Sequence, residues 1–179
     1  MNKGLFKQAA AGAALAMAFG AAQAATFAEG TLDVYGTNNF TQVAHVAAGS
    51  FTDYFTFSLV QTGANSASSA VALDLGTLFD MTGTLSLFQG STPGSGTLIG
   101  GGWAFNGTSG STSHSVLLTS GGDYYLQATG TATGSGGGNY LVSLNVAPVP
   151  EPETYALMMA GLGLMGFVAR RRKQQGSAA

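Results

Sequence analysis

The residue types that most often perform chemistry are scarce in this chain. The two histidines, His45 and His114, have no second ligand at metal-binding spacing and no neighbouring glutamate, so we expect no zinc site. There is no cysteine, which excludes disulfide bonds, thiolate metal sites and a cysteine nucleophile. Residues 107–111 lack the last glycine of a serine nucleophile elbow. The sequence therefore predicts no enzymatic activity, no metal site built on histidine or cysteine and no cofactor, and it leaves calcium binding open.

Paired carboxylates are the remaining route to catalysis, because two of them can cleave a glycosidic bond. The acids in the middle of the chain show no pairing signal, and no Asp-x-Asp-x-Asp run indicates a calcium loop. These acids are Glu29, Asp33, Asp53, Asp74, Asp80 and Asp123.

Basic residues lie only near the two ends of the chain. None occurs between Thr26 and Ala169, which argues against nucleic-acid binding, because that affinity depends on Lys and Arg contacts to phosphates. Removal of both ends would therefore leave a strongly acidic product. The basic residues are Lys3, Lys7, Arg170, Arg171, Arg172 and Lys173.

The first part of the chain, residues 1–24, has the features of a secretory signal peptide. A basic start precedes an apolar run over residues 9–22, and Ala22-Gln23-Ala24 is the small-x-small pattern that signal peptidase accepts. We expect recognition of Ala22 and Ala24, cleavage after Ala24, and export by the general secretion machinery. An amphipathic surface helix is the alternative, but no polar face interrupts the apolar run.

The other end of the chain carries a second apolar stretch. Residues 154–169 are uncharged, and Arg170, Arg171, Arg172 and Lys173 follow at once. This pattern predicts a single transmembrane helix over 154–169, with 170–179 as a cytoplasmic basic tail. At ~1.5 Å per residue the stretch covers roughly 24 Å, which is shorter than a ~30 Å hydrocarbon core. The alternative is an amphipathic helix that is buried against the preceding domain.

A proline-rich linker, residues 148–153, precedes this stretch. Its prolines favour an extended backbone, which we expect to join neither the sheet nor the helix. The triplet Pro150-Glu151-Pro152, the apolar stretch and the arginine cluster together resemble the PEP-CTERM sorting signal. The resemblance implies recognition of Pro150, Glu151 and Pro152 by exosortase, a membrane-embedded cysteine peptidase of Gram-negative bacteria that make exopolysaccharide. Exosortase would remove the tail near the triplet.

Residues 25–147 show apolar alternation with a period of two, in short runs that Gly, Asn, Ser and Pro separate. This pattern predicts an all-β domain, an antiparallel β-sandwich with jelly-roll-like connections. The expected strands are 31–35, 41–46, 54–61, 70–75, 83–89, 97–100, 103–105, 115–118, 124–131 and 140–146.

One of these runs places Phe51, Asp53 and Phe55 on the same face of a strand. Because an unpaired buried carboxylate is costly, we expect Asp53 to lie at the end of the strand and accept backbone N–H bonds, with ion coordination as the alternative. Phe51, Asp53 and Phe55 resemble the motif of the FxDxF group of PEP-CTERM proteins, and the resemblance continues through 122–126 and 138–140. The layout is also similar to accessory β-sandwich domains of secreted bacterial peptidases.

Trp103 could stack on a sugar, but its alternation with Phe105 favours a place in the core. We predict a non-enzymatic surface or extracellular-matrix protein of a biofilm. It would be held transiently at the inner membrane with its body in the periplasm, and then reach the cell surface. The alternatives are a module that binds exopolysaccharide and a periplasmic protein that stays anchored to the membrane.

Overall fold

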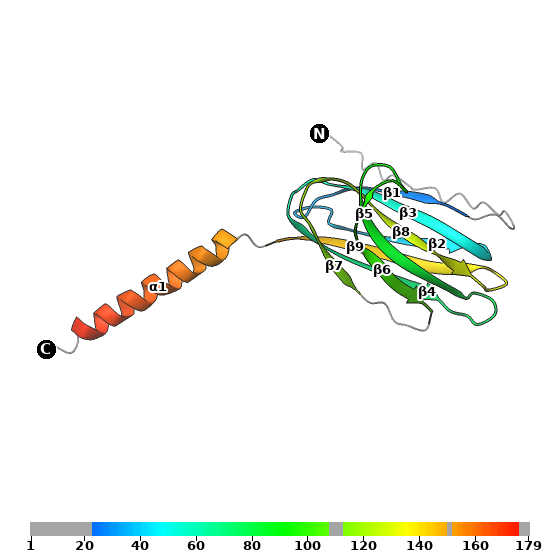
Figure 1. The fold of residues 1–179 in the computed structure, drawn as a ribbon. Coiled ribbons are helices and arrows are strands. Elements are labelled where there is room, and N and C mark those ends of the chain that lie inside the picture. The colour runs from blue at the N-terminus through cyan, green and yellow to red at the C-terminus, as the bar shows by residue number, and fades with distance from the viewer. Residues whose placement is uncertain (1–22, 108–112, 150–151, 176–179) are drawn as a thin grey trace, which may run out of the picture.

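The computed structural model describes residues 23–107, 113–149 and 152–175. Within them, nine strands form a two-layer β-sandwich and a helix follows the last strand (Figure 1). The order in the five-stranded sheet is β1 (Thr26–Leu32), β3 (Gly49–Leu59), β8 (Gly122–Ala132), β5 (Met81–Gln89) and β6 (Thr97–Asn106). The order in the four-stranded sheet is β2 (Asn39–Val46), β9 (Gly138–Pro148), β4 (Ala64–Leu73) and β7 (His114–Leu118).

The core lies between the two sheets and is built from alternate residues of each strand. Along β3 the buried positions recur every second residue from Phe51 to Leu59, as the period-two pattern predicted. Tyr140 of β9 packs against Phe51 and Phe55, with ring centroids 5.4 Å and 6.3 Å away. The opposing sheets therefore share one aromatic cluster.

The strand order has the connections of a jelly roll. From β2 onward the chain alternates between the two sheets, and the β5–β6 hairpin is the one exception among the described strands. The pairing is antiparallel throughout, except that β1 pairs with β3 in parallel. The expected antiparallel sandwich is therefore present except at this edge, where β1 and β3 run in parallel. The chain passes through β2 in the opposite sheet between β1 and β3, and such a crossover is what allows two strands of one sheet to run in the same direction.

Several expected strands differ from those in the structure. The runs 54–61 and 70–75 begin earlier, as β3 (Gly49–Leu59) and β4 (Ala64–Leu73). The first expected strand begins and ends earlier than 31–35, because Asp33 closes a turn in which its carboxylate accepts the Tyr35 N–H at 2.8 Å. The runs 97–100 and 103–105 are one strand, β6, whose pairing with β5 contains irregularities. Gly102 lies near this irregular region and has a φ of 75°, which a side-chain-bearing residue rarely adopts.

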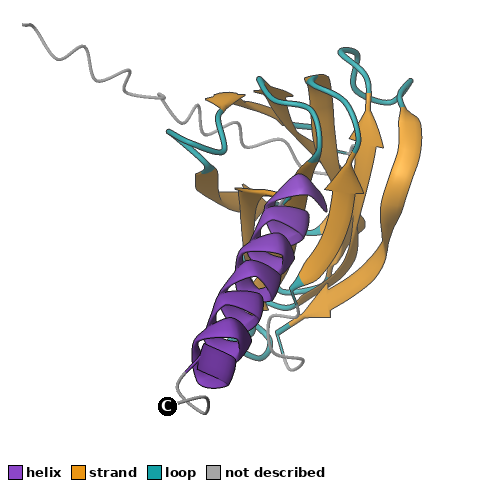
Figure 2. Cartoon of the chain, turned by 90° about the vertical axis from the view of Figure 1, so that its left-hand side faces the viewer, coloured by secondary structure: helices purple, strands orange, loops and turns teal. Residues whose placement is uncertain are grey.

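Helix α1 (Pro152–Gln175) leaves the end of the sandwich and projects away from both sheets (Figures 1 and 2). It is longer at both ends than the predicted helix over 154–169. Pro152 can open the helix because the first helical residue needs no N–H partner, and the basic cluster continues the helix because Arg and Lys are good helix formers. The expectation that the linker 148–153 joins neither sheet nor helix was therefore wrong at both its ends.

No helix in the described part of the chain is both long and apolar enough to cross a membrane. The predicted transmembrane segment over 154–169 is therefore not confirmed. The apolar stretch is bounded by Glu153 and Arg170, and it contains glycines at 161, 163 and 166.

Candidate functional site

The sorting tail begins where β9 leaves the sheet. Pro148, the last residue of β9, still pairs with Ala64 of β4, and the Val149 N–H donates to the Gly63 carbonyl at 3.3 Å. Pro152 then opens α1. Of the three predicted recognition residues, Pro150 and Glu151 lie outside the described residues and Pro152 alone is placed. The strand that carries the tail lies between β2 and β4, so the sandwich holds it from both sides.

Helix α1 presents apolar side chains to solvent. Every residue from 155 to 168 is exposed, including Leu157 at 74%, Leu164 at 67% and Phe167 at 65%. The alternative of an amphipathic helix buried against the domain is therefore wrong. A helix that is apolar on all sides is normally enclosed by lipid or by protein. Arg170 is exposed near its far end, and the side chains of 171–173 are outside the description.

The three residues of the predicted family motif lie on the inner face of β3. Phe51, Asp53 and Phe55 are all buried, and Asp53 is 2% exposed. Asp53 lies inside the strand, so its predicted place at a strand end was wrong. The expected backbone donor is present, because the Ala25 N–H donates to Oδ1 at 2.8 Å. The hydroxyl of Tyr140 donates to Oδ2 at 2.6 Å.

The charge state of this cluster follows from its burial. Burial raises the pKa of the Asp53 carboxyl, and the hydrogen bonds from Tyr140 and Ala25 partly oppose that rise. Burial and the neighbouring carboxylate raise the pKa of Tyr140, so its hydroxyl stays protonated and donates. Sequence reasoning did not find Ala25 or Tyr140 as partners of Asp53. They lie 28 and 87 residues away along the chain.

The predicted signal peptidase site lies beside this cluster. Ala22 is outside the described residues, whereas Ala24 is exposed and Ala25 is half-buried. Gln23 extends the β1 edge: its carbonyl accepts the Thr52 N–H at 2.7 Å, and its Oε1 accepts the Ala47 N–H at 3.0 Å. The backbone from Gln23 to Ala25, which includes the expected cleavage site, therefore runs beside β3 and is hydrogen-bonded to it.

Trp103 is half-buried and packs against the edge of the core, as its alternation with Phe105 predicted. Its ring stacks on His114 with centroids 4.8 Å apart and planes 2° apart, so His114 covers one of the two faces that a sugar could use.

The two histidines lie far apart in the fold. His45 is on β2 and His114 on β7, which are the opposite edges of the four-stranded sheet. The Nδ1 atom of His45 is 2.9 Å from Oδ1 of Asn139. Within the described ranges, no three His, Asp or Glu side chains are grouped to hold a metal ion.

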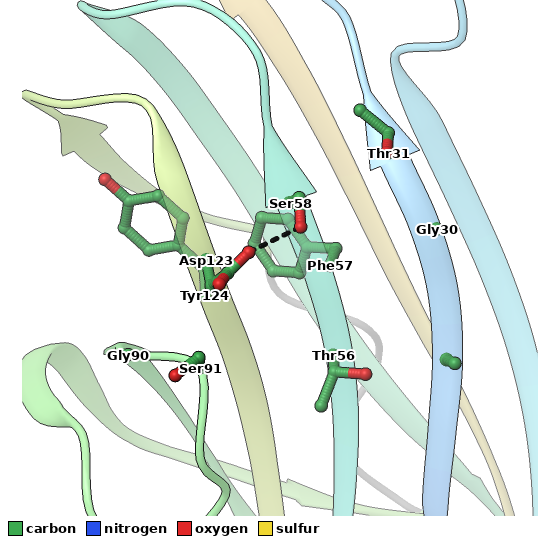
Figure 3. A pocket seen from close by; sticks show the side chains of 10 residues that line it. Gly30, Thr31, Thr56, Phe57, Ser58, Gly90, Ser91, Asp123 and Tyr124 are labelled. Atoms are coloured by element: carbon green, nitrogen blue, oxygen red, sulfur yellow. Dashed lines mark hydrogen bonds between the residues drawn. The ribbon is translucent and has the colours of Figure 1, made fainter.

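A shallow groove of about 320 Å³ crosses the outer part of the five-stranded sheet (Figure 3). Segments of β1, β3 and β8 and the turn after β5 line it. Asp123 is the one carboxylate among its described lining residues, and it accepts a hydrogen bond from the Ser58 hydroxyl at 2.6 Å. This hydrogen bond links the neighbouring strands β3 and β8.

Comparisons with known proteins agree with the geometry of the tail. The family model of the PEP-CTERM protein-sorting motif matches residues 148–173. That match does not reach β3, so assignment to the FxDxF group stays a prediction. Among curated protein sequences, none matches the chain. Among solved structures, the pre-peptidase C-terminal domain of a collagenase from Bacillus anthracis is similar at 20% identity and a TM-score of 0.44, covering 67% of this chain and 94% of that one.

Proposed function

We propose that this chain, which carries a PEP-CTERM protein-sorting motif, is a non-enzymatic surface or extracellular-matrix protein that exosortase processes during export. The observation that carries the proposal is the coincidence of the motif with a structural boundary. The matched residues, 148–173, begin at the last residue of β9 and run through most of the exposed helix α1. The sorting signal is thus physically separate from the folded body.

The junction suits a processing peptidase. A peptidase needs an extended backbone that it can reach without unfolding its substrate. The backbone between β9 and α1 follows the last sheet hydrogen bond, which Val149 makes, and precedes the first turn of the helix. Cleavage there would leave all strands of the sandwich intact. Glu151, flanked by Pro150 and Pro152, would supply the side chain that the peptidase recognises.

The apolar surface of α1 suits a transient stay at the inner membrane. Leu157, Leu164 and Phe167 are exposed to water in the isolated chain, and their transfer to lipid or to an apolar protein surface would be favourable. The basic cluster at residues 170–173 would remain on the cytoplasmic side. The body would face the periplasm and, once cleaved, move to the cell surface or matrix.

The test compares the exported chain in a host with and without exosortase by intact-mass spectrometry. We expect a product that has lost Arg170–Lys173 in the first host and a chain that keeps them in the second. Glu151→Ala should block the trimming, whereas Glu153→Ala, a change of the same kind two residues on, should not. An exported mature chain that retains residues 170–173 in both hosts would replace this proposal with permanent anchoring.

Trypsin offers a second readout. A body that has lost both ends contains no Lys or Arg, because none lies between Thr26 and Ala169. The mature product should therefore survive trypsin even after denaturation, and an unprocessed chain should be cut at its C-terminal arginines.

A further inference from the structure

The nitrogen of Ala25 belongs to the peptide bond at which we expect the leader to be cut, and it lies 2.8 Å from Oδ1 of the buried Asp53. We propose that cleavage after Ala24 creates an ammonium group on Ala25 that forms an ion pair with Asp53, so that Asp53 is a built-in receptor for the new N-terminus. The inference rests on the export step of the proposed function. It assigns a role to the central residue of the Phe51–Phe55 motif.

The chemistry needs only water. Hydrolysis of the Ala24–Ala25 bond places the oxygen of one water on the Ala24 carbonyl carbon, which leaves as a carboxylate. Both protons of that water go to the Ala25 nitrogen, which becomes an ammonium group. A neutral N–H donor thus turns into a positive charge at the same atom.

Asp53 lacks a cationic partner before this step. The two donors that the structure gives its carboxylate, the Ala25 N–H and the Tyr140 O–H, are both neutral. The sequence supplies no lysine or arginine between Thr26 and Ala169. The histidines are engaged elsewhere, His45 with Asn139 and His114 with Trp103. A buried carboxylate with neutral donors alone is costly to ionise, and a nearby positive charge offsets that cost.

Other titratable groups do not take the place of the ammonium. Tyr140 of β9 is the titratable side chain that faces Asp53 from the opposite sheet, and burial together with the carboxylate keeps it protonated by raising its pKa. Glu29, on β1, is acidic and cannot compensate a carboxylate. The pKa of Asp53 itself is raised by burial, which agrees with a carboxyl group that has no cation beside it.

The geometry needs no rearrangement. The Ala25 carbonyl accepts the Tyr54 N–H at 2.8 Å, and Thr26 pairs with Tyr54 in the parallel ladder. These contacts lie on the C-terminal side of the cut and survive it. The Ala25 nitrogen therefore stays beside Oδ1 after cleavage, while Ala24, which is exposed, is released.

The same edge of the sheet is stabilised by the signal peptide before cleavage and by the ion pair after it. In the uncut chain Gln23 secures this edge through its bonds with Thr52 and Ala47. Cleavage removes Gln23 and exposes those two N–H groups to water. The ammonium group of Ala25 would then hold the start of β1 against β3, a role that Gln23 has in the uncut chain.

The test measures the pKa of the N-terminal amine in the chain exported by its host. Mass spectrometry first establishes that the chain begins at Ala25. The amine is then labelled by ¹³C-methylation and titrated by NMR; lysines 3 and 7 are gone, so Lys173 is the one other amine that can be present. We expect a pKa at least about one unit above the ordinary ~7.7–8.0 of an α-amino group.

Two variants separate the ion pair from a merely folded N-terminus. Asp53→Asn should return the amine to its ordinary pKa, whereas Asp123→Asn, an exposed acid that bonds to Ser58, should leave it raised. A glycine inserted between Ala24 and Ala25 keeps Asp53 and restores a peptide N–H at Ala25. This insertion should also return the amine to its ordinary pKa, and it serves if Asp53→Asn does not fold.

The outcomes distinguish this inference from the sorting proposal. An exported chain that begins elsewhere than Ala25, or an amine with ordinary pKa in the unmodified chain, overturns the ion pair and leaves tail processing untouched. A chain that keeps its C-terminal tail in the presence of exosortase overturns the sorting proposal without affecting the N-terminal measurement.

Discussion

The hydroxyl of Tyr140 donates a 2.6 Å hydrogen bond to the carboxylate of Asp53, and this bond joins the two sheets across the core. Asp53 belongs to β3 in one sheet and Tyr140 to β9 in the other. Since β9 also carries the sorting tail, a single strand links the buried carboxylate with the C-terminal signal. The two features are eight residues apart on β9, or roughly 27 Å at the rise of an antiparallel strand.

Tyr140→Phe should lower the free energy of unfolding by about 1–3 kcal/mol, because it leaves Oδ2 of a buried carboxylate without a donor. Urea denaturation of the exported chain measures this loss. Tyr54→Phe is the matched control, since the Tyr54 hydroxyl makes only a 3.4 Å contact with the Gln127 amide. Equal losses in the two variants would contradict a special role for the Asp53–Tyr140 bond.

The pH dependence of stability should report on Asp53 in a chain whose Ala25 nitrogen remains a peptide N–H. Burial raises the pKa of Asp53 in the folded state, so the fold binds this proton more tightly than the unfolded chain does. The contribution is fully present below the ordinary carboxyl pKa and is lost as pH rises through the raised folded value. Asp53→Asn should flatten that part of the profile, measured as Tm between pH 3 and 7 in steps of about half a unit.

Ser68→Ala should leave stability unchanged or raise it slightly. Its hydroxyl is buried and has no hydrogen-bond partner among the described residues, and such a group costs free energy in the fold. The neighbouring Ser66 is the comparison, because its hydroxyl donates to the Val116 carbonyl at 3.0 Å. Ser66→Ala should cost about 1 kcal/mol in urea denaturation. A larger loss for Ser68→Ala than for Ser66→Ala would contradict this assignment.

Binding of the untrimmed chain to lipid vesicles should depend on α1. Leu157→Lys and Leu164→Lys place charges on its apolar surface and should reduce flotation with vesicles several-fold, since each removes a favourable transfer to lipid. Leu98→Lys is the control, because Leu98 is 58% exposed on β6. If the Leu98 variant loses binding as strongly as the α1 variants, the helix is not the binding element.

Trp103→Ala should destabilise the sandwich by about 2 kcal/mol, less than a fully buried aromatic residue would, because the ring is half-buried against the core and His114. It should leave the affinity for the host's exopolysaccharide unchanged in calorimetry. Trp103 is the sole tryptophan, so its fluorescence follows unfolding directly. A heat of polysaccharide binding in calorimetry that Trp103→Phe abolishes would favour the carbohydrate-binding alternative instead.

The parts of the sandwich that depend on apolar alternation within a single strand could be predicted from the sequence. The alternation from Phe51 to Leu59 gave the inner face of β3 correctly, because the period of two is a property of the extended backbone itself. The parallel edge formed by β1 was missed. Its partner β3 becomes adjacent only after the chain has passed through the other sheet, and no local pattern records that pairing.

The sorting tail and the contacts of Asp53 show the same contrast between local and long-range information. The PEP-CTERM motif is contiguous and was found from residues 150–152 and the apolar stretch that follows. The partners of Asp53 are Ala25, just before β1, and Tyr140 on β9, which lie 28 and 87 residues away along the chain. The expected burial of Asp53 predicted that its carboxylate needs donors, but the sequence could not name them. The helix ends were misjudged because Pro152 was taken to exclude helix rather than to begin it.

The central place of β9 has a mechanical consequence. The strand pairs with β2 on one side and with β4 on the other, up to Pro148. If the trimmed C-terminus is joined to the cell surface, a pull on the body acts lengthwise on β9 and must shear both ladders at once. Attachment through an interior strand thus lets the domain bear tension that a strand at the rim would release by peeling away one bond at a time.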